Sequence, residues 1–523
     1  MQQTPVTQTD FPPNHAGRGT LGSLAVNVAI VGWGKGGKTL AVALHKAGKK
    51  VAVIEQSEAM QGGTCINIGC VPTKALVSQA EQAFRVRNVL NGSAFDNAGK
   101  LCTDLPAHQF TKAVAVRDLL IKQLREVNHA MLADIDNVAI VGGKASFAGT
   151  AHGKIKTLLV SDGSNTVEVT AETVVINTGS VPAIPEDITG IPQEILAGKA
   201  DIALPDGAEQ QTTAHGVYTS TTLQHADPLP RSLVIIGAGF IALEFAAMFA
   251  NFGAKVTVLN RGSEILPGED EPVRASVTKV LAAQGIEFVH NSKVTELTPA
   301  TTGTDVTVSA TVAGNTQEFK AAAILLATGR KPATAGLNLA EAEITTGDHG
   351  EIVVDEFLQT NAPGVFAIGD VNGGPQHTYI SLDDFRIVKE KLLNGSTSRS
   401  TKDRVAVPAT TFITPPFSQV GLTASAARQA GHKIKTVNKP VATIKAMPRP
   451  KAVGDSRGII SIVVDAETDL ILGARLFHVD SQEVINLIAL AMRAKITAST
   501  LRDSIWTHPA STEALNEVLA ELT

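Results

Sequence analysis

The fold is decided by a stretch near the amino terminus, VNVAIVGWGKGGKTLAVALHKAGKKVAVIEQ, at residues 26–56. An apolar run leads into a glycine turn, then into a segment with helical apolar spacing, and then into a second apolar run ending at Glu55. A second copy of this pattern, SLVIIGAGFIALEFAAMFANFGAKVTVLNRG, occupies residues 232–262. Each copy predicts strand, turn, helix and strand, so two dinucleotide-binding folds are expected in one chain.

The first glycine turn has the spacing G-x-G-x-x-G at Gly32, Gly34 and Gly37. The first glycine permits the tight turn, the second lets backbone approach a pyrophosphate, and the third lets the helix pack close to the strand. Glu55 follows at the end of the next strand, where a carboxylate can accept hydrogen bonds from ribose hydroxyls. This context favours a dinucleotide site over a purely structural glycine turn.

The second turn differs from the first at two points. It has Gly237, Gly239 and Ala242, and its second strand ends in Asn260 and Arg261 instead of an acid. A carboxylate there would repel a 2′-phosphate, whereas an arginine attracts one. The sequence therefore favours NADPH over NADH, with a solvated arginine at a strand end as the alternative reading.

Composition bounds the class of protein. The chain has 523 residues, 45 Lys+Arg against 50 Asp+Glu, and 44% hydrophobic residues, which suggests about three globular domains. The sequence has no basic stripe of the kind that binds nucleic acid, and it has no uninterrupted apolar run of about 18 residues that would predict a membrane span. Residues 1–23 lack an export signal and are expected to form a flexible tail, which places the protein in the cytoplasm.

Two of the three cysteines, Cys65 and Cys70, lie in GGTCINIGCVPTKALV at residues 62–77. A regular helix would separate residues five apart by about 140°, whereas a disulfide needs Cα atoms within about 6.8 Å. The intervening INIG must therefore be irregular, which Gly69 can permit, and Pro72 suits the first turn of a helix starting near Cys70.

The amino end of that helix would lower the pKa of the Cys70 thiol, which favours a redox couple over a structural disulfide. A zinc site would need about four ligands, and the chain has no second cysteine pair. Two buried, unpaired thiols are the other alternative. Cys102 has no partner or motif and is interpreted as a packed or incidental thiol.

Shorter apolar runs are expected to be buried strands that deliver loops to a ligand: TVVINTGS (173–180), AAILLATGR (322–330) and GVFAIGDVNGG (364–374). From about Asp403 the pattern changes to candidate strands VATIKAM (441–447), GIISIVVD (458–465) and LILGARLF (470–477), followed by an amphipathic helix at 481–497.

These motifs together make the chain resemble the pyridine nucleotide-disulfide oxidoreductases, which include lipoamide dehydrogenase, glutathione reductase and mercuric reductase. The resemblance covers about residues 26–522 and rests on GWGKGG with Glu55, GGTCINIGCVPTK, INTGS, GAGFIALE, LLATGRKP, FAIGDV and HPASTEAL, in the family's order. It implies an α/β fold with two Rossmann-like domains, one binding FAD and one NAD(P), plus a C-terminal α+β dimerisation domain. The implied divisions are a tail at 1–23, an FAD domain at 24–190 and 350–402, an NAD(P) domain at 217–349, a loop or insertion at 186–216, and a dimerisation domain at 403–523.

The resemblance also implies residue roles. The FAD-binding residues would be Gly32, Gly34, Gly37, Glu55, Gly63, Thr64, Lys74, Thr178, Gly179 and Asp370. The nucleotide-binding residues would be Gly237, Gly239, Ala242, Asn260, Arg261 and Gly329. Cys70 would lie beside the flavin and form a charge-transfer complex, while Cys65 would exchange with substrate. Lys74 would lie beside the flavin's reactive nitrogen and pair with Glu244, because a lone buried charge is costly. His508 and Glu513 would reach the active site of the other subunit of a homodimer and move protons there.

Within the family, GGTCINIGCVPTK, HTYISLDDFRIV and TFITPPFSQVG are similar to the reactive-chlorine-resistance flavoproteins, a branch with Cu(II) reductase activity. No cysteine follows Cys102, unlike in mercuric reductases, and the segment after Asp370 lacks the alanine-histidine stretch of lipoamide dehydrogenases. Asn260 and Arg261 depart from the acid expected in this branch.

The expected activity is that of an NADPH-dependent, FAD-containing reductase. Cys65 and Cys70 would hold a substrate Cu(II) or Hg(II) transiently, because thiolates are soft ligands. Lipoamide or another small disulfide is the alternative acceptor, and a thiol redox sensor without rapid turnover is the alternative of another class. The complete pair of His508 and Glu513 favours an enzyme.

Overall fold

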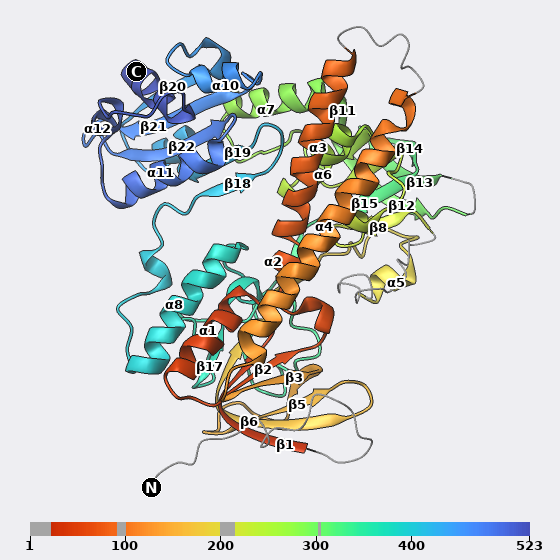
Figure 1. Cartoon of the computed structure of the whole chain (residues 1–523), viewed down its shortest axis with the longest axis vertical. Coiled ribbons are helices and arrows are strands. Elements are labelled where there is room, and N and C mark those ends of the chain that lie inside the picture. Colours follow the sequence, from red (N-terminus) through yellow and green to blue (C-terminus); the bar gives the residue numbers. More distant parts are fainter. Residues whose placement is uncertain (1–21, 92–100, 199–214, 302–304) are drawn as a thin grey trace.

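The first copy of the pattern builds a seven-stranded sheet in the computed structural model, which describes residues 22–91, 101–198, 215–301 and 305–523. Six strands run in the order β3–β2–β1–β6–β5–β4, and β17 pairs with β6. Their bounds are β1 (Gly22–Val31), β2 (Val51–Glu55), β3 (Val138–Gly142), β4 (Lys144–Phe147), β5 (Lys156–Ser161), β6 (Thr166–Ile176) and β17 (Val365–Ala367). Helices α1 (Lys35–Lys46) and α8 (Thr378–Asn394) contact one another beside this sheet (Figure 1).

Strand β1 explains why the first apolar run is continuous and does not alternate with polar residues. Val28 and Ile30 are buried in one hydrophobic cluster, while Ala29 and Val31 are buried in another, so both faces of the strand are covered. The strand begins at Gly22 and pairs with β6 from its first residue. The expected tail at 1–23 therefore includes two residues of the sheet, and residues 1–21 lie outside the described part.

The second copy builds a parallel sheet in the order β11–β10–β9–β15–β8. Its strands are β8 (Val217–Thr219), β9 (Ser232–Ile236), β10 (Lys255–Leu259), β11 (Ile286–Val289) and β15 (Ala323–Leu326), with helices α6 (Phe240–Phe252) and α7 (Glu271–Ala283). An antiparallel sheet of β12 (Ser292–Thr298), β13 (Val306–Val312) and β14 (Asn315–Ala321) adjoins it, and β7 (Ser180–Pro182) pairs with β16 (Arg330–Pro332). All three predicted buried strands, in β6, β15 and β17, are confirmed.

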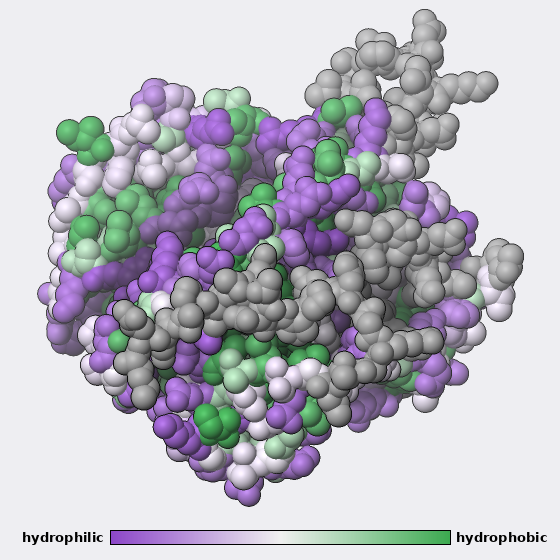
Figure 2. All heavy atoms as spheres, turned by 60° about the horizontal axis from the view of Figure 1, so that its bottom comes forward, coloured by the Kyte–Doolittle hydropathy of each residue, from purple (hydrophilic) through white to green (hydrophobic). Residues whose placement is uncertain are grey.

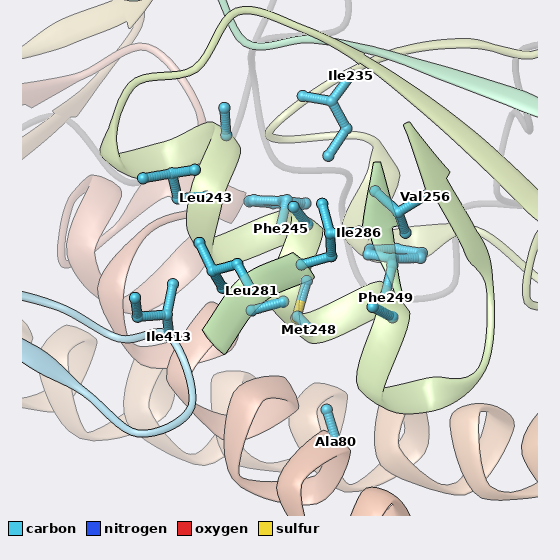
Figure 3. Close-up of a cluster of buried hydrophobic side chains, with 14 of the residues drawn as sticks. Ala80, Ile235, Leu243, Phe245, Met248, Phe249, Val256, Leu281, Ile286 and Ile413 are labelled. Atoms are coloured by element: carbon cyan, nitrogen blue, oxygen red, sulfur yellow. The ribbon is translucent and has the colours of Figure 1, made fainter. Parts of the chain in front are cut away.

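Two long helices tie the first unit to the second. They are α3 (Cys70–Asn91), which follows the short α2 (Thr64–Asn67), and α4 (Leu101–Ala133), and they run side by side in Figure 1. Ala80 of α3 packs into the apolar cluster around Phe249 of α6, which Figure 3 shows. Phe110 of α4 lies with its ring centroid 5.7 Å from that of Phe249 and 5.1 Å from that of Phe252. The helix that begins at Cys70 is therefore anchored in the core of the second unit.

The carboxyl-terminal unit is an antiparallel sheet in the order β18–β19–β22–β21–β20, with α11 packed on it. Its strands are β18 (Ala409–Thr411), β19 (Phe417–Gly421), β20 (Ile434–Pro440), β21 (Ile459–Asp465) and β22 (Ile471–Phe477), and its helices are α9 (Ala424–Gln429), α10 (Pro448–Ala452), α11 (Ser481–Arg493), α12 (Ala498–Arg502) and α13 (Ala514–Val518). The predicted fold class, two α/β nucleotide folds and an α+β unit, is confirmed.

One predicted strand of this unit is wrong. VATIKAM is a 3₁₀ turn, η6 (Val441–Thr443), followed by irregular backbone, and the strand is the preceding segment, β20. The buried residues are Val441, Ile444 and Met447, so the apolar spacing is three and not the two of a strand.

Two segments pack across the expected divisions. In the described part of 186–216, Ile188, Ile191 and Ile195 enter the core of the second unit, the last from α5 (Gln193–Leu196). Residues 199–214 lie outside the described residues. Leu337 and Leu339 pack under the first sheet, although the expected division at 349 assigns them to the second unit.

Polar side chains cover much of the face shown in Figure 2, with apolar side chains in separate groups. Across the described ranges, no helix is long and apolar enough to cross a membrane.

Candidate functional site

A cavity of about 2450 Å³ lies between the first and second units. Both glycine turns, the cysteine loop and the amino end of α8 line it. The predicted site residues among its lining are Gly32, Gly34, Glu55, Gly63, Thr64, Cys65, Cys70, Lys74, Thr178, Gly179, Gly237, Gly239, Glu244, Asn260, Arg261, Gly329 and Asp370. The structure thus brings most of the predicted residues, from distant parts of the chain, to one hollow.

The first glycine turn is shaped around Asn177, which directly follows β6. Gly32 has φ +101°, and a Cβ there would lie 2.3 Å from the Asn177 carbonyl oxygen. A Cβ on Gly34 would lie 2.6 Å from Asn177 Oδ1, and the Gly37 N–H donates to that same oxygen at 2.9 Å. Gly37 does not line the cavity and packs behind the turn, so the three glycines are explained by close approach to one residue, Asn177, that the motif does not name: Gly32 to its carbonyl, and Gly34 and Gly37 to its side chain.

Glu55 lies at the end of β2, beside this turn. Its Oε2 accepts from the Trp33 N–H at 3.0 Å and its Oε1 from the Ser57 N–H at 3.2 Å. Burial raises the pKa of Glu55 to about 7, although these backbone donors act in the opposite direction. Near neutral pH, hydrogen bonds donated by the hydroxyl groups of a ligand would therefore stabilise the charged form of this carboxylate.

Two other observations fit the adenosine and ribityl parts of FAD. Thr178 Oγ1 is buried against the cavity and has no hydrogen-bond partner within the described residues. Asp370, in η4 (Gly369–Asn372), lines the cavity, and its Oδ2 accepts a hydrogen bond from Ser180 Oγ at 2.7 Å. Among the described residues, this is the one side-chain hydrogen bond to Asp370. Arg330 in turn holds Ser180, through its hydroxyl at 2.8 Å and its carbonyl at 2.6 Å. An orphaned hydroxyl and an anchored carboxylate are the groups that a polyhydroxylated ligand needs, so the residues present fit FAD.

The cysteine loop has the predicted irregular geometry. Helix α2 ends at Asn67 and α3 begins at Cys70, so the helix breaks at Ile68 and Gly69. Gly69 is needed for space and not for a left-handed conformation, because a Cβ there would lie 2.9 Å from the Thr64 carbonyl oxygen. Cys65 and Cys70 are both free thiols, which corresponds to the reduced form of the couple.

The two thiols differ in acidity. The hydrogen bond from Cys65 lowers the pKa of Cys70 to about 6, with smaller contributions from Thr378 and Lys74, while burial acts against them. The same hydrogen bond and burial raise the pKa of Cys65. The pKa of Cys70 shifts in the predicted direction, and the largest cause of the shift is the hydrogen bond from its partner thiol.

Residues at the start of α8 form the opposite wall, and sequence reasoning did not identify them as site residues. Thr378 Oγ1 lies 3.6 Å from Cys70 Sγ. The rings of His377 and Tyr379 stack with centroids 4.9 Å apart, and the Tyr379 hydroxyl donates to the Pro408 carbonyl. Burial lowers the pKa of His377 and raises that of Tyr379 to about 12, so both rings face the cavity uncharged at neutral pH.

Lys74, one helical turn after Cys70, forms the expected ion pair with Glu244 of α6 at 2.6 Å. Glu244 Oε1 also accepts from the Phe412 N–H at 2.7 Å, and the Lys74 ammonium lies 5.0 Å from the Phe412 ring centroid. The pair joins the cysteine helix to the second unit at the wall of the cavity.

The second glycine turn repeats the first. Gly237 has φ +109°, and a Cβ there would lie 2.4 Å from the Ala327 carbonyl oxygen, whereas Gly239 faces open space. Ala242 is buried in α6 and does not line the cavity. Asn260 is also buried, and its amide donates to the Glu264 carbonyl at 2.8 Å, so it shapes the loop.

Arg261 is exposed and lines the cavity, and no ion pair holds it among the described residues. Its guanidinium is therefore free to meet an anionic ligand at the end of the second nucleotide fold.

His508 and Glu513 do not join the others. His508 Nδ1 lies 2.9 Å from Glu513 Oε1 in the carboxyl-terminal unit, and neither residue lines the cavity. The backbone N–H of Ala510 and the contact with His508 lower the pKa of Glu513, which keeps the carboxylate charged beside the imidazole. Within one chain, this pair is not brought to the cysteines.

Three further observations complete the site. Lys38 is buried behind the cysteine loop, and its ammonium donates to the Gly62 carbonyl at 3.3 Å and to Asn128 Oδ1. Cys102 falls in a stretch of α4 whose side chains lie outside the described residues. The described residues contain no group of three or more His, Cys, Asp or Glu side chains that could hold a metal ion, and Cys65 and Cys70 are the thiol donors that line the cavity.

Comparison with known proteins agrees with this geometry. Residues 26–384 match the pyridine nucleotide-disulphide oxidoreductase family, and residues 407–519 match its dimerisation domain. The chain is 40% identical over 491 residues to the probable pyridine nucleotide-disulfide oxidoreductase RclA of Escherichia coli (strain K12), covering 94% of this chain and 98% of that one. It is 30% identical over 498 residues to a mercuric reductase of Staphylococcus aureus, covering 95% and 82%. Among solved structures, the Cu(II) complex of the HOCl-induced flavoprotein disulfide reductase RclA from Escherichia coli superposes with a TM-score of 0.81 at 40% identity, covering 95% and 99%.

Proposed function

The chain belongs to the pyridine nucleotide-disulphide oxidoreductase family, and we propose that it is an NADPH-dependent flavoprotein reductase whose Cys65–Cys70 couple delivers electrons to a metal ion such as Cu(II). Family membership implies an oxidoreductase that uses FAD and a pyridine nucleotide. The observation that carries the proposal is the pair itself: two free thiols of opposite pKa shift line one cavity with two nucleotide-type glycine turns.

Bound along the first glycine turn, FAD would accept a hydride from a reduced nicotinamide and supply two electrons to the disulfide. Gly32 and Gly34 would let the backbone approach its pyrophosphate, Glu55 and Thr178 would hold its adenosine half, and Asp370 its ribityl chain. Lys74 would place its cation beside the ring system, while Glu244 balances that charge.

The reduced pair would act through unequal thiols. Two electrons and one proton convert the disulfide into a Cys65 thiol and a Cys70 thiolate, which Thr378 and Lys74 favour. Because soft thiolates prefer Cu(I), a Cu(II) ion held at the pair would be drawn toward reduction. Cu(II) takes up one electron, so two ions would be reduced for each NADPH consumed. The Cu(II) complex solved for the relative from Escherichia coli supports this acceptor.

The proton balance would need a second copy of the chain. We assign His508 and Glu513 to the active site of the partner subunit in a homodimer, because the match to the dimerisation domain covers both residues and neither lines the cavity of its own chain. His508 would take and return the Cys65 proton, and Glu513 would hold its tautomer.

Steady-state NADPH consumption with Cu(II), Hg(II), oxidised glutathione and lipoamide, compared side by side, tests the proposal. Cu(II)-dependent turnover should be lost in Cys65→Ser and retained in Cys102→Ser, the matched control. Turnover highest with lipoamide or glutathione would instead favour a disulfide reductase. If no acceptor supports turnover that Cys65→Ser abolishes, the chain acts as a thiol redox sensor and the reductase proposal fails.

Arg261 would select NADPH by pairing with its 2′-phosphate. Arg261→Glu should raise KM for NADPH about tenfold or more, the effect of losing a hydrogen bond to a charged group, while changing KM for NADH little. Lys255→Glu, at the other end of β10, is the matched control because Lys255 is exposed and does not line the cavity. Equal effects of Arg261→Glu on both nucleotides would reject this role.

A further inference from the structure

The break between the two cysteines leaves one backbone acceptor in need of a partner. In a continuous helix the Ile68 carbonyl would accept from the N–H four residues later, but that residue is Pro72, which has none. Ile68 is 6% exposed, so water does not readily replace the missing donor. The irregular geometry that lets Cys65 and Cys70 meet thus depends on a donor from outside the loop.

Gln224 supplies that donor from the second unit. Its Nε2 donates to the Ile68 carbonyl at 2.8 Å and to the Ser220 carbonyl at 2.8 Å, which uses both amide hydrogens. The side chain is 1% exposed, and its Oε1 has no partner in the described part of the chain. An isosteric apolar side chain would therefore fill the same space without the two bonds.

Gln224 is itself held firmly. It lies in η3 (Leu223–His225), where Leu223 is fully buried in the apolar cluster shared by α3, α4 and α6. The Gln224 carbonyl accepts from Arg117 Nη1, and the Arg117 side chain, on α4, is fully buried. The amide that reaches Ile68 is thus fixed from both its own turn and the long helix beside it.

The segment that carries Gln224 joins β8 to β9 of the second sheet, and Ser220 within it lines the cavity. The hydrogen bond to Ile68 therefore ties the cysteine loop to the unit that contains the second glycine turn. Two further contacts hold the remainder of the loop from other sides: Asn67 Nδ2 donates to the Gly63 carbonyl at 3.0 Å in a buried hydrogen bond, and Arg125 Nε donates to Asn67 Oδ1 at 3.1 Å in a partly buried one.

We propose that Gln224 is a positioning residue for the redox couple: it donates to the carbonyl that Pro72 leaves unpaired and so holds the backbone break that lets Cys65 and Cys70 form a disulfide. This inference rests on the proposed function of the pair. Loss of the bond should allow other loop conformations in which the Cα atoms are not within disulfide range, and so should disfavour the disulfide relative to the dithiol.

A dithiothreitol redox buffer measures this equilibrium. The Cys65–Cys70 bond forms as the ring disulfide of oxidised dithiothreitol breaks, and two electrons and two protons pass from the cysteines to dithiothreitol. The FAD-loaded chain is equilibrated, quenched by alkylation, and the peptide containing both cysteines is quantified by mass spectrometry.

Gln224→Met should lower the equilibrium constant for disulfide formation about three- to tenfold, the range of one hydrogen bond. At 29.6 mV for each tenfold change, the reduction potential of the couple should rise by about 15 to 30 mV. Gln224→Asn, which keeps an amide but is one methylene shorter, should shift the equilibrium in the same direction by less, and it serves if the methionine variant folds poorly.

Gln284→Met is the matched control, because Gln284 Nε2 donates to the Thr414 carbonyl at 2.6 Å and its Oε1 is likewise buried without a partner in the described chain. This control should leave the couple unchanged. An unchanged equilibrium in both Gln224 variants with FAD bound would overturn the inference, and so would an equal shift in Gln284→Met. Cu(II)-dependent turnover of the parent chain and of Cys65→Ser reports separately on the proposed function.

Discussion

Lys38 should make the stability of the folded chain depend on pH in the alkaline range. The side chain is 5% exposed, and the pKa of its ammonium is lowered from 10.5 to about 8, first by burial and then by repulsion from Lys35, with Cys65 acting in the opposite direction. Its hydrogen-bond acceptors in the described chain are the Gly62 carbonyl and Asn128 Oδ1, which are both neutral. Folding therefore holds a charge in a site that disfavours it.

The sign follows from proton counting. Between pH 8 and 10.5 the unfolded chain keeps the Lys38 proton while the folded chain releases it, so the free energy of unfolding rises with pH across this window. At about 1.4 kcal/mol for each pKa unit, the difference between 10.5 and about 8 corresponds to about 3 kcal/mol as an upper bound. Below pH 8 both states carry the proton, and this contribution is constant.

Lys38→Met removes the titrating group. As pH rises from 7.5 to 10.5, the free energy of unfolding of the parent should therefore increase relative to that of the variant by about 3 kcal/mol or less. Urea unfolding of the FAD-loaded chains at pH 7.5, 9 and 10.5 measures this difference, and subtraction cancels the other lysines and tyrosines. Lys46→Met, exposed on the same helix, is the matched control. A difference between parent and Lys38→Met that stays within about 0.5 kcal/mol over the whole range would refute the reasoning.

Three further predictions concern the cofactor turn, the buried ion pair and the core. Because burial raises the pKa of Glu55 to about 7, the affinity of the apoprotein for FAD should fall up to about tenfold from pH 8 to pH 6. Glu55→Gln should remove this pH dependence. Flavin fluorescence titration measures both affinities, and an equal pH dependence in parent and variant would contradict the proposed role of Glu55. Lys74→Met should lower the free energy of unfolding by about 2 kcal/mol in urea, because it leaves Glu244, 11% exposed, without its cation. Glu244→Gln should lower it by less. A larger loss in Glu244→Gln than in Lys74→Met would count against the ion pair. Phe249→Ala should lower the free energy of unfolding by about 3 to 5 kcal/mol in the same assay, because the ring is fully buried in the cluster shared by α3, α4 and α6. Ile155→Ala, at a half-exposed position, should change it by under about 1 kcal/mol. Similar losses of stability in the two variants would contradict the packing around Phe249.

The parts of the fold that the sequence predicts are those whose signal is local. Gly32 and Gly237 each end an apolar run and open a helical pattern, and the structure gives both a positive φ and a close carbonyl neighbour. The break between Cys65 and Cys70 is predictable for the same reason, because five-residue spacing, Gly69 and Pro72 all act within one turn of chain.

The prediction of a strand at VATIKAM failed because a short apolar run does not reveal its own period. Val441, Ile444 and Met447 recur every third residue, but the valine and isoleucine that suit a strand made the run look extended. The true strand, β20, lies at the edge of its sheet, where its polar alternate residues can face solvent, so its apolar signal is weak.

The site residues missed by sequence reasoning share a different property, since each acts on backbone or thiol atoms far away in the sequence. Asn177 shapes a turn 140 residues earlier, Gln224 binds a carbonyl 156 residues earlier, and Thr378 contacts a thiol 308 residues earlier. Asparagine, glutamine and threonine are common surface residues, so their types carry no signal until the fold brings them to a buried partner.

The shape of the site is imposed by contacts between segments that lie far apart in the sequence. The cysteine loop has no hydrophobic core of its own beyond a small cluster around Ala59 and Ile68. Its shape is imposed by α3, which is anchored among the phenylalanines of α6, and by Gln224. These anchors tie the thiols to the second unit, while Lys38 of α1, through the Gly62 carbonyl, and Thr378 of α8 tie them to the first. A change in the packing of α6 should therefore reach the cysteine couple through α3 and Gln224, whereas the first glycine turn is held by a different side chain, Asn177.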